Sequence, residues 1–229
     1  MTLNVGHLVG FGAFSASSVV VLSNPSNNSS ESDLATYTFS TQALGDAAAD
    51  RHIIVACYGE VVAAGTTVSS VTAGGVAGTI LKQKTFNVVS VDAVSAIAIA
   101  AVPTGTTGDI VIVFSATMLR GFASVFRMVG GSATAHATAE SATGTTDPQT
   151  LSIAVPEGGG CVACCGYFAA SGTTTWTGLT EAYDNIQGTA SFSSAFANFS
   201  AAQASLAVTA DPNNAITRAS MVAVSFSPT

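Results

Sequence analysis

Three cysteines within five residues, Cys161, Cys164 and Cys165, are the densest set of potential metal ligands or nucleophiles in the chain. A structural zinc site needs four ligands, usually two pairs at fixed spacing, and only Cys57 and His136 suggest themselves to complete one. The three lie in a strand-like run, where Cys161 and Cys165 share one face and Cys164 points to the other. We therefore interpret them as small core residues and predict no metal and no cofactor.

The histidines give little support for nucleophilic catalysis. Asp50 and His52 could be combined with one of many serines into a triad, since triads are recognised by geometry rather than by order. The chain lacks, however, the Gly-x-Ser-x-Gly turn that presents a serine nucleophile. We interpret Asp50 and Arg51 as a loop ion pair or cap, and we predict that the protein is not an enzyme and has no catalytic residues.

Residues 173–184, TTTWTGLTEAYD, carry the arrangement that best suggests ligand binding. Glu181 and Asp184 are paired carboxylates of the type that glycosidases use, and Trp176 and Tyr183 offer aromatic rings on which a sugar could stack. The alternative is a solvated loop with a packed tryptophan, because aromatic side chains mostly lie in cores or interfaces. If this set has a role, we expect it to be glycan binding rather than hydrolysis.

Composition argues against two classes of partner. The 229 residues include only six Lys or Arg, the net charge is −7, and Lys82 and Lys84 are the only clustered cations. Nucleic-acid binding is therefore not expected. The chain has no run of about 20 apolar residues that could span a membrane as a helix, and its first residues lack the basic start of a signal peptide.

The low charge of the chain needs an explanation. Only 8% of the residues are charged, against about 25% in typical domains, and the mean hydropathy is +0.50. Obligate subunit interfaces resemble a protein core cut in half. We therefore expect large contacts between subunits.

Strand signals dominate from Tyr37 onward, and no segment shows a convincing amphipathic helical pattern. In TVSSVTAGGVAGTILKQ, residues 67–83, the pair Gly74 and Gly75 accepts the positive φ of a tight hairpin turn. Residues 44–52 could form a turn or two of helix, and residues 132–149 a long loop or an edge region. Many short strands at roughly 8–12-residue spacing predict an all-β, antiparallel, jelly-roll-like β-sandwich.

Two parts are predicted along the chain: an N-terminal arm with a polar loop over residues 1–35, and a single β-sandwich domain over residues 36–229. The polar loop is NPSNNSSESD, residues 24–33, by its composition. Residues 1–16 are rich in glycine and apolar side chains and are the candidate docking arm. Its apolar side chains are Leu3, Val5, Leu8, Val9, Phe11 and Phe14.

The succession TYTFS, LGDAAADRHIIVACYG, SSVTAGGVAGTIL, AAVPTGTTGDIVIVFS and TTTWTGLTEAYD resembles the small β-sandwich structural proteins of tailed bacteriophages. The resemblance is one of overall pattern over roughly residues 36–227, and no functional residue is carried over from it. It implies a non-enzymatic virion protein on the capsid or tail surface, assembled in the host cytoplasm as a homotrimer or another symmetric oligomer.

The function expected from this resemblance is capsid decoration, in which the protein docks on the major capsid protein and reinforces the shell. The alternative is a tail or fibre module that binds a host glycan or receptor.

Overall fold

The computed structural model describes residues 18–61, 65–88, 91–168 and 172–229. No helix occurs among these residues, so the predicted all-β class is confirmed; residues 44–51 form a loop instead of a helical turn. The strands are β1 (Val21–Ser30), β2 (Leu34–Ala43), β3 (His52–Val61), β4 (Val68–Ala73), β5 (Val76–Ala77), β6 (Thr79–Val88), β7 (Val91–Ala101), β8 (Thr107–Met118), β9 (Arg120–Val129), β10 (Gly131–Thr143), β11 (Gln149–Val155), β12 (Gly160–Phe168), β13 (Thr174–Thr177), β14 (Thr180–Gln187), β15 (Ala190–Asn198), β16 (Gln203–Pro212) and β17 (Arg218–Pro228).

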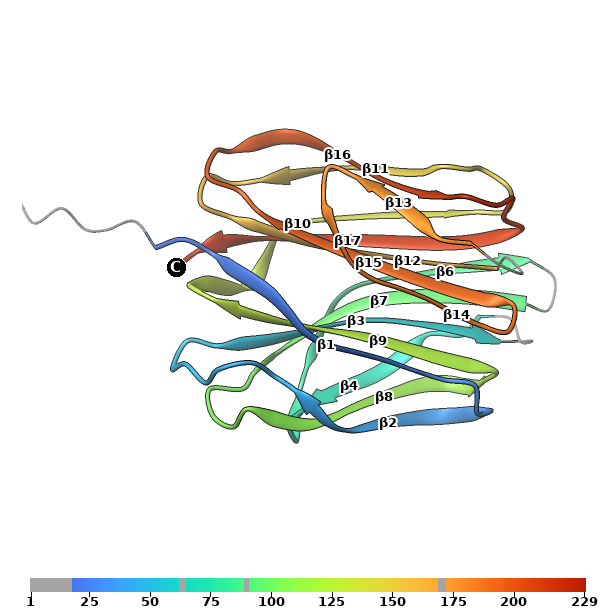
Figure 1. Cartoon of the computed structure of the whole chain (residues 1–229), viewed down its shortest axis with the longest axis horizontal. Coiled ribbons are helices and arrows are strands. Elements are labelled where there is room, and N and C mark those ends of the chain that lie inside the picture. Colours follow the sequence, from blue (N-terminus) through green and yellow to red (C-terminus); the bar gives the residue numbers. More distant parts are fainter. Residues whose placement is uncertain (1–17, 62–64, 89–90, 169–171) are drawn as a thin grey trace, which may run out of the picture.

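These strands form four antiparallel sheets that stack in layers (Figure 1). We number the sheets in stacking order. Sheet 1 has the order β2-β8-β4-β5, sheet 2 β1-β9-β3-β7-β6, sheet 3 β10-β17-β12-β15-β14, and sheet 4 β11-β16-β13. A separate hydrophobic core fills each of the three spaces between neighbouring sheets.

The two halves of the chain have the same topology. Leaving aside the two-residue strand β5, the strands up to β9 make a first set of eight and β10 to β17 a second. Both inner sheets have the order first-eighth-third-sixth-fifth, and both outer sheets the order second-seventh-fourth. Sheets 1 and 2 therefore form one sandwich and sheets 3 and 4 another, whereas the sequence predicted a single sandwich over residues 36–229.

The two sandwiches meet in the way that two subunits meet across a two-fold axis. Equivalent rows on the inner sheets are Ser95–Tyr58–Phe122 in sheet 2 and Phe192–Gly166–Ser220 in sheet 3. Across the interface, the rings of Phe122 and Phe192 lie 5.7 Å apart, and the hydroxyls of Ser95 and Ser220 are 2.8 Å apart. In each pair, a residue on the sixth strand of one half contacts a residue on the eighth strand of the other half. Such reciprocal contacts are typical of an isologous dimer.

Tyr58 and Gly166 occupy the centre of this arrangement. The Tyr58 ring covers Gly166 so closely that no space remains for a Cβ atom there. The same ring stacks at 6.3 Å on Phe192 and lies 5.7 Å from Phe122. One half therefore supplies a large ring and the other a glycine at equivalent positions, so the two inner sheets can approach closely.

This layering accounts for part of the low charge. Sheets 2 and 3 are covered on both faces, so β3, β12 and β17 are buried along nearly their whole length. Strands buried on both faces are continuous apolar runs rather than alternating ones. Contacts within the chain thus use much of the apolar surface that the sequence assigned to subunit contacts.

Gly74 and Gly75 form the predicted turn, with φ values of 56° and 79°, between the paired residues Ala73 and Val76. Residues 131–143 form the edge strand of sheet 3, which agrees with the edge alternative for residues 132–149.

The prediction of a polar loop over residues 24–33 was wrong for most of its length. Residues up to Ser30 belong to β1, which pairs with β9. A register shift between Ser23 and Ser26 accommodates Asn24, whose side-chain amide donates to the Val125 carbonyl at 2.8 Å. Polar side chains satisfy the backbone at this edge strand, so composition alone indicated a loop.

Candidate functional site

The cysteines lie in the cores. Cys161 and Cys165 belong to the core between sheets 3 and 4, and Cys164 to the core between sheets 2 and 3, so the predicted alternation is confirmed. All four thiols are free and buried. Burial raises the pKa of Cys57 and of Cys161 to about 12. A thiol held protonated in this way is a poor nucleophile and a poor metal ligand.

Asp50 and Arg51 make separate contacts in the loops beside β3. The Asp50 carboxylate accepts a hydrogen bond from the Gly130 amide at 2.7 Å. Arg51 is 1% exposed, and its guanidinium donates to backbone carbonyls of two loops, those of Gly45, Val102, Thr104 and Gly105, at 2.6–2.8 Å. The predicted Asp50–Arg51 ion pair is therefore replaced by two separate loop anchors.

Trp176 is held by sheet 3. It lies half-buried on β13, and its indole N–H donates to the Ser193 hydroxyl on β15 at 2.7 Å. Ser193 in turn donates to the Tyr183 carbonyl at 3.0 Å. The tryptophan thus packs against the core between sheets 3 and 4, in agreement with the packed alternative for this segment.

The two carboxylates of the segment do share a site. Glu181 and Asp184 line a hollow of about 340 Å³ together with Gly172 and Thr173. Asp184 accepts a hydrogen bond from the Thr174 amide at 2.7 Å. Burial raises the pKa of both carboxyls, and the charge of Asp184 adds to the rise at Glu181.

Tyr183 points away from this hollow. Its ring lies 6.1 Å from that of Phe192 in the core between sheets 2 and 3. Asn185 donates a side-chain hydrogen bond to its hydroxyl at 2.6 Å. The structure therefore brings Glu181 and Asp184 together, but it places Tyr183 and Trp176 in the cores on opposite faces of sheet 3, with a register shift in β14 between Glu181 and Tyr183.

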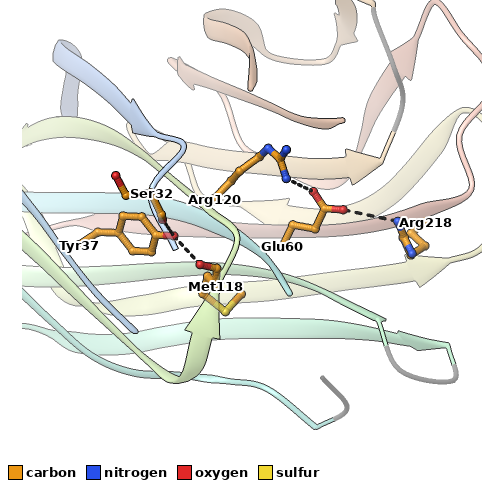
Figure 2. Close-up of polar contacts among 6 residues, drawn as sticks. All are labelled: Ser32, Tyr37, Glu60, Met118, Arg120 and Arg218. Carbon is orange, nitrogen blue, oxygen red and sulfur yellow. Dashed lines mark hydrogen bonds and ion pairs between the residues drawn. The ribbon is translucent and has the colours of Figure 1, made fainter. Parts of the chain in front are cut away.

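Sequence reasoning missed a buried ionic cluster at one end of the central interface (Figure 2). Glu60, at the end of β3, is 3% exposed. Its carboxylate lies 3.7 Å from Arg120 and 3.5 Å from Arg218. Desolvation raises the pKa of Glu60, and the two arginines oppose that rise. The sequence signal was a lone acid that ends an otherwise apolar run, HIIVACYGEV.

The internal repeat explains the composition of this cluster. Glu60 lies opposite Arg120 on the third and eighth strands of the first half, and Phe168 lies opposite Arg218 on the same two strands of the second. Arg218 sits 4.0 Å above the Phe168 ring, a cation–π distance. Phe168 is thus the residue of the second half that is equivalent to Glu60. Because Phe168 carries no charge, both arginines lie beside the one carboxylate of Glu60.

A second polar contact, made by Tyr37 of β2, joins the link between β1 and β2 to the end of β8 (Figure 2). The Tyr37 hydroxyl lies 2.7 Å from the Ser32 carbonyl oxygen and 3.0 Å from that of Met118, so its single O–H is shared between these two acceptors. Its ring closes over Gly121. Burial raises the pKa of Tyr37 to about 12, so the phenol stays protonated and acts as a fixed donor.

Each of the six basic side chains already has a structural partner. Lys82 and Lys84 on β6 pair with Glu140 on β10, at 2.7 and 2.9 Å. Arg127 donates to the Asp46 carbonyl at 2.7 Å, and Arg51, Arg120 and Arg218 are engaged as described above. All six cations thus serve contacts within the protein.

The candidate docking arm, Leu3, Val5, Leu8, Val9, Phe11 and Phe14, lies outside the described residues. Within the described ranges, no three His, Cys, Asp or Glu side chains are placed to hold a metal ion. The same ranges contain no helix long and apolar enough to cross a membrane.

Comparison with protein-family models, with curated proteins and with solved structures finds no match to this chain. The resemblance to tailed-phage structural proteins stays a prediction.

Proposed function

We propose that this protein is a non-enzymatic structural component of an assembled particle, and specifically a virion protein of a tailed phage that decorates the capsid. The proposal rests on one observation: the basic side chains and the buried acid make contacts within the protein. The basic side chains and the buried carboxylate of Glu60 hold loops and sandwiches together, and the thiols are buried. A stable scaffold needs such groups, whereas catalysis needs titratable groups that face a substrate.

The outer faces of the stack support a role in display or assembly. On sheet 1 the exposed positions of β2 include Thr36, Thr38 and Ser40. On sheet 4 the outward residues include Thr150 and Thr209, whose hydroxyls are 3.2 Å apart. The outward faces also carry exposed aspartates, Asp109 on β8 and Asp211 on β16. Positions with small uncharged side chains can be covered by a neighbouring protein without the cost of burying charges.

We assign each set of eight strands as a jelly roll, so that the chain is a tandem of two. The support is the shared strand order, in which the first strand neighbours the eighth and the second neighbours the seventh. Such double Greek keys occur in viral capsid proteins and in lectins.

Native mass spectrometry of the purified chain tests the assembly part of the proposal. A homotrimer or another closed symmetric oligomer is the expected result, because sheet edges are best covered in a ring. A chain that stays monomeric at high concentration would contradict it. Proteomic analysis of purified virions from producing cells tests the location, and absence of the chain from the particles would overturn the virion assignment.

Binding of a host glycan by a tail or fibre module remains the second candidate, because Glu181 and Asp184 share a hollow. A glycan array with Asp184→Asn tests this function, and Glu31→Gln, an exposed acid outside the hollow, is its control. Loss of a specific glycan signal in Asp184→Asn alone would favour this candidate over capsid decoration. Absence of any glycan signal in the unaltered chain would exclude it.

A further inference from the structure

A second hollow, of about 490 Å³, lies where β5, β6, β7 and β10 meet. Its wall is mainly apolar and includes Val76, Leu81 and Ile99. Val76 is 38% exposed, one of the few large apolar side chains on the described surface. A concave apolar wall of this kind is typical of a binding site for an apolar side chain or segment.

The backbone beside this hollow has unpaired edges. The pairing of β6 with β7 begins at Thr79 and Ile99 and does not include Ala100 or Ala101. On the opposite side of β7, Ala100 and Ala101 pair with Ile53 and His52 of β3. The Val102 amide donates toward β3, to Arg51, so the Ala101 N–H and C=O point the opposite way, toward the hollow. On that side the chain before Thr79 is β5, which pairs with β4 of sheet 1 and not with β7.

The opposite wall is a bulge. The register of β10 with β17 shifts between Gly131 and Ala135, so residues 132–134 are not paired with β17. Ala133 and Thr134 line the hollow. Apolar side-chain space between two unpaired backbone edges is the geometry that accepts an extended peptide by strand addition.

We propose that this hollow binds the apolar N-terminal segment of the same chain, residues 3–14. The described chain starts beside it: the Val19 carbonyl contacts Gly130, and Ala133 is three residues further along, at most about 11 Å away. The five residues from Phe14 to Val19 can span about 17 Å when extended. Phe14 and the residues before it can therefore reach the hollow.

The chemistry of the segment and the hollow agree. Residues 1–16 contain no Asp, Glu, Lys or Arg, and no such side chain lines the hollow. The segment can therefore dock without desolvating any of these charges, and His52 is the titratable side chain on the wall. A segment tethered to its own hollow has an effective concentration on the order of millimolar, which favours it over the segment of a second copy. This inference does not depend on the proposed virion function.

Hydrogen–deuterium exchange of peptides that contain Ala101 tests the proposal. The full chain is compared with a variant that lacks residues 1–16, and with Ala133→Glu in the full chain. Ala133 is exposed, so this substitution adds a charge to the wall of the hollow without disturbing a core. Ala207→Glu, at an exposed position on sheet 4, is the matched control.

We expect exchange at Ala101 to be on the order of tenfold faster in the truncated chain and in Ala133→Glu, and unchanged in Ala207→Glu. The difference should be the same at two protein concentrations that differ roughly tenfold, because binding within one chain does not depend on concentration. Equal exchange in the full and truncated chains would overturn the proposal. Protection that grows with protein concentration would also overturn it, since the occupant would then be a second copy.

Discussion

Arg120 and Arg218 occupy equivalent positions in the two halves of the chain, and both reach the carboxylate of Glu60. Arg218 belongs to the second sandwich and Glu60 to the first, so this cluster joins the two across the central interface. A similar group joins them at β6 and β10, where Lys82 and Lys84 share Glu140. The two groups differ in burial, and this difference has a measurable consequence.

The two glutamates should contribute to stability with opposite pH dependence. Burial raises the pKa of Glu60 above its ordinary value of 4.5, so its contribution is full below pH 4.5 and is lost as the pH rises through the raised value. In the unaltered chain, ionisation of Glu60 should lower the free energy of unfolding as the pH rises above 4.5, and Glu60→Gln should remove this decline. Urea unfolding at a series of pH values measures both chains. An identical pH profile in the variant and the unaltered chain would contradict the burial argument.

Glu140→Gln is the matched control for that experiment. Hydrogen bonds from Lys82 and Lys84 lower the pKa of Glu140 below 4.5, so its contribution is present above pH 4.5 and is lost as the pH falls. Its side chain is 34% exposed, and we expect a loss of less than about 1 kcal/mol above pH 4.5. The two variants should thus change the slope of the pH profile in opposite directions.

Gly166→Ala should destabilise the interface between the sandwiches. The added methyl group has no space under the Tyr58 ring, and moving that ring disturbs its contacts with Phe122 and Phe192. Overpacking of this kind costs about 1–3 kcal/mol. Gly144→Ala is the control, because a Cβ there would meet Phe86 at an ordinary 3.5 Å. Equal unfolding midpoints for both variants in urea would argue against a close approach at Gly166.

Arg51→Lys should cost about 2–4 kcal/mol, although it keeps the charge. The guanidinium serves carbonyls of two loops from a buried position, and an ammonium cannot reproduce this planar set of donors. Arg127→Lys, where the guanidinium makes one exposed contact to Asp46, should change the free energy of unfolding by less than about 1 kcal/mol. Thermal melts followed by circular dichroism compare the two, and similar losses would show that Arg51 has no special role.

The thiols should be inert in the folded protein. Cys57, Cys161, Cys164 and Cys165 are all buried with raised pKa values. A disulfide reagent such as Ellman's should therefore titrate no thiol in native buffer and all four in denaturant. Rapid reaction of one thiol under native conditions would identify a cysteine that is accessible after all.

The sequence predicted those features that depend on near neighbours in the chain. Alternating and buried-type runs gave the all-β class, two adjacent glycines gave the turn at Gly74 and Gly75, and strand periodicity placed Cys164 opposite Cys161 and Cys165. It failed at β1, because polar side chains there satisfy backbone groups of an edge strand. It also grouped Tyr183 with Trp176, since the register shift between Glu181 and Tyr183 cannot be seen in the residues.

By itself, then, the sequence determined that the chain is built from strands and which faces of its regularly alternating strands are apolar, because side-chain alternation is a local property of the extended backbone. Only the tertiary structure decided that these strands form two sandwiches of one topology, that Tyr58 covers Gly166, and that Arg120 and Arg218 share Glu60. These relationships join residues far apart in the chain. They depend on which sheet packs against which, and no local pattern specifies that choice.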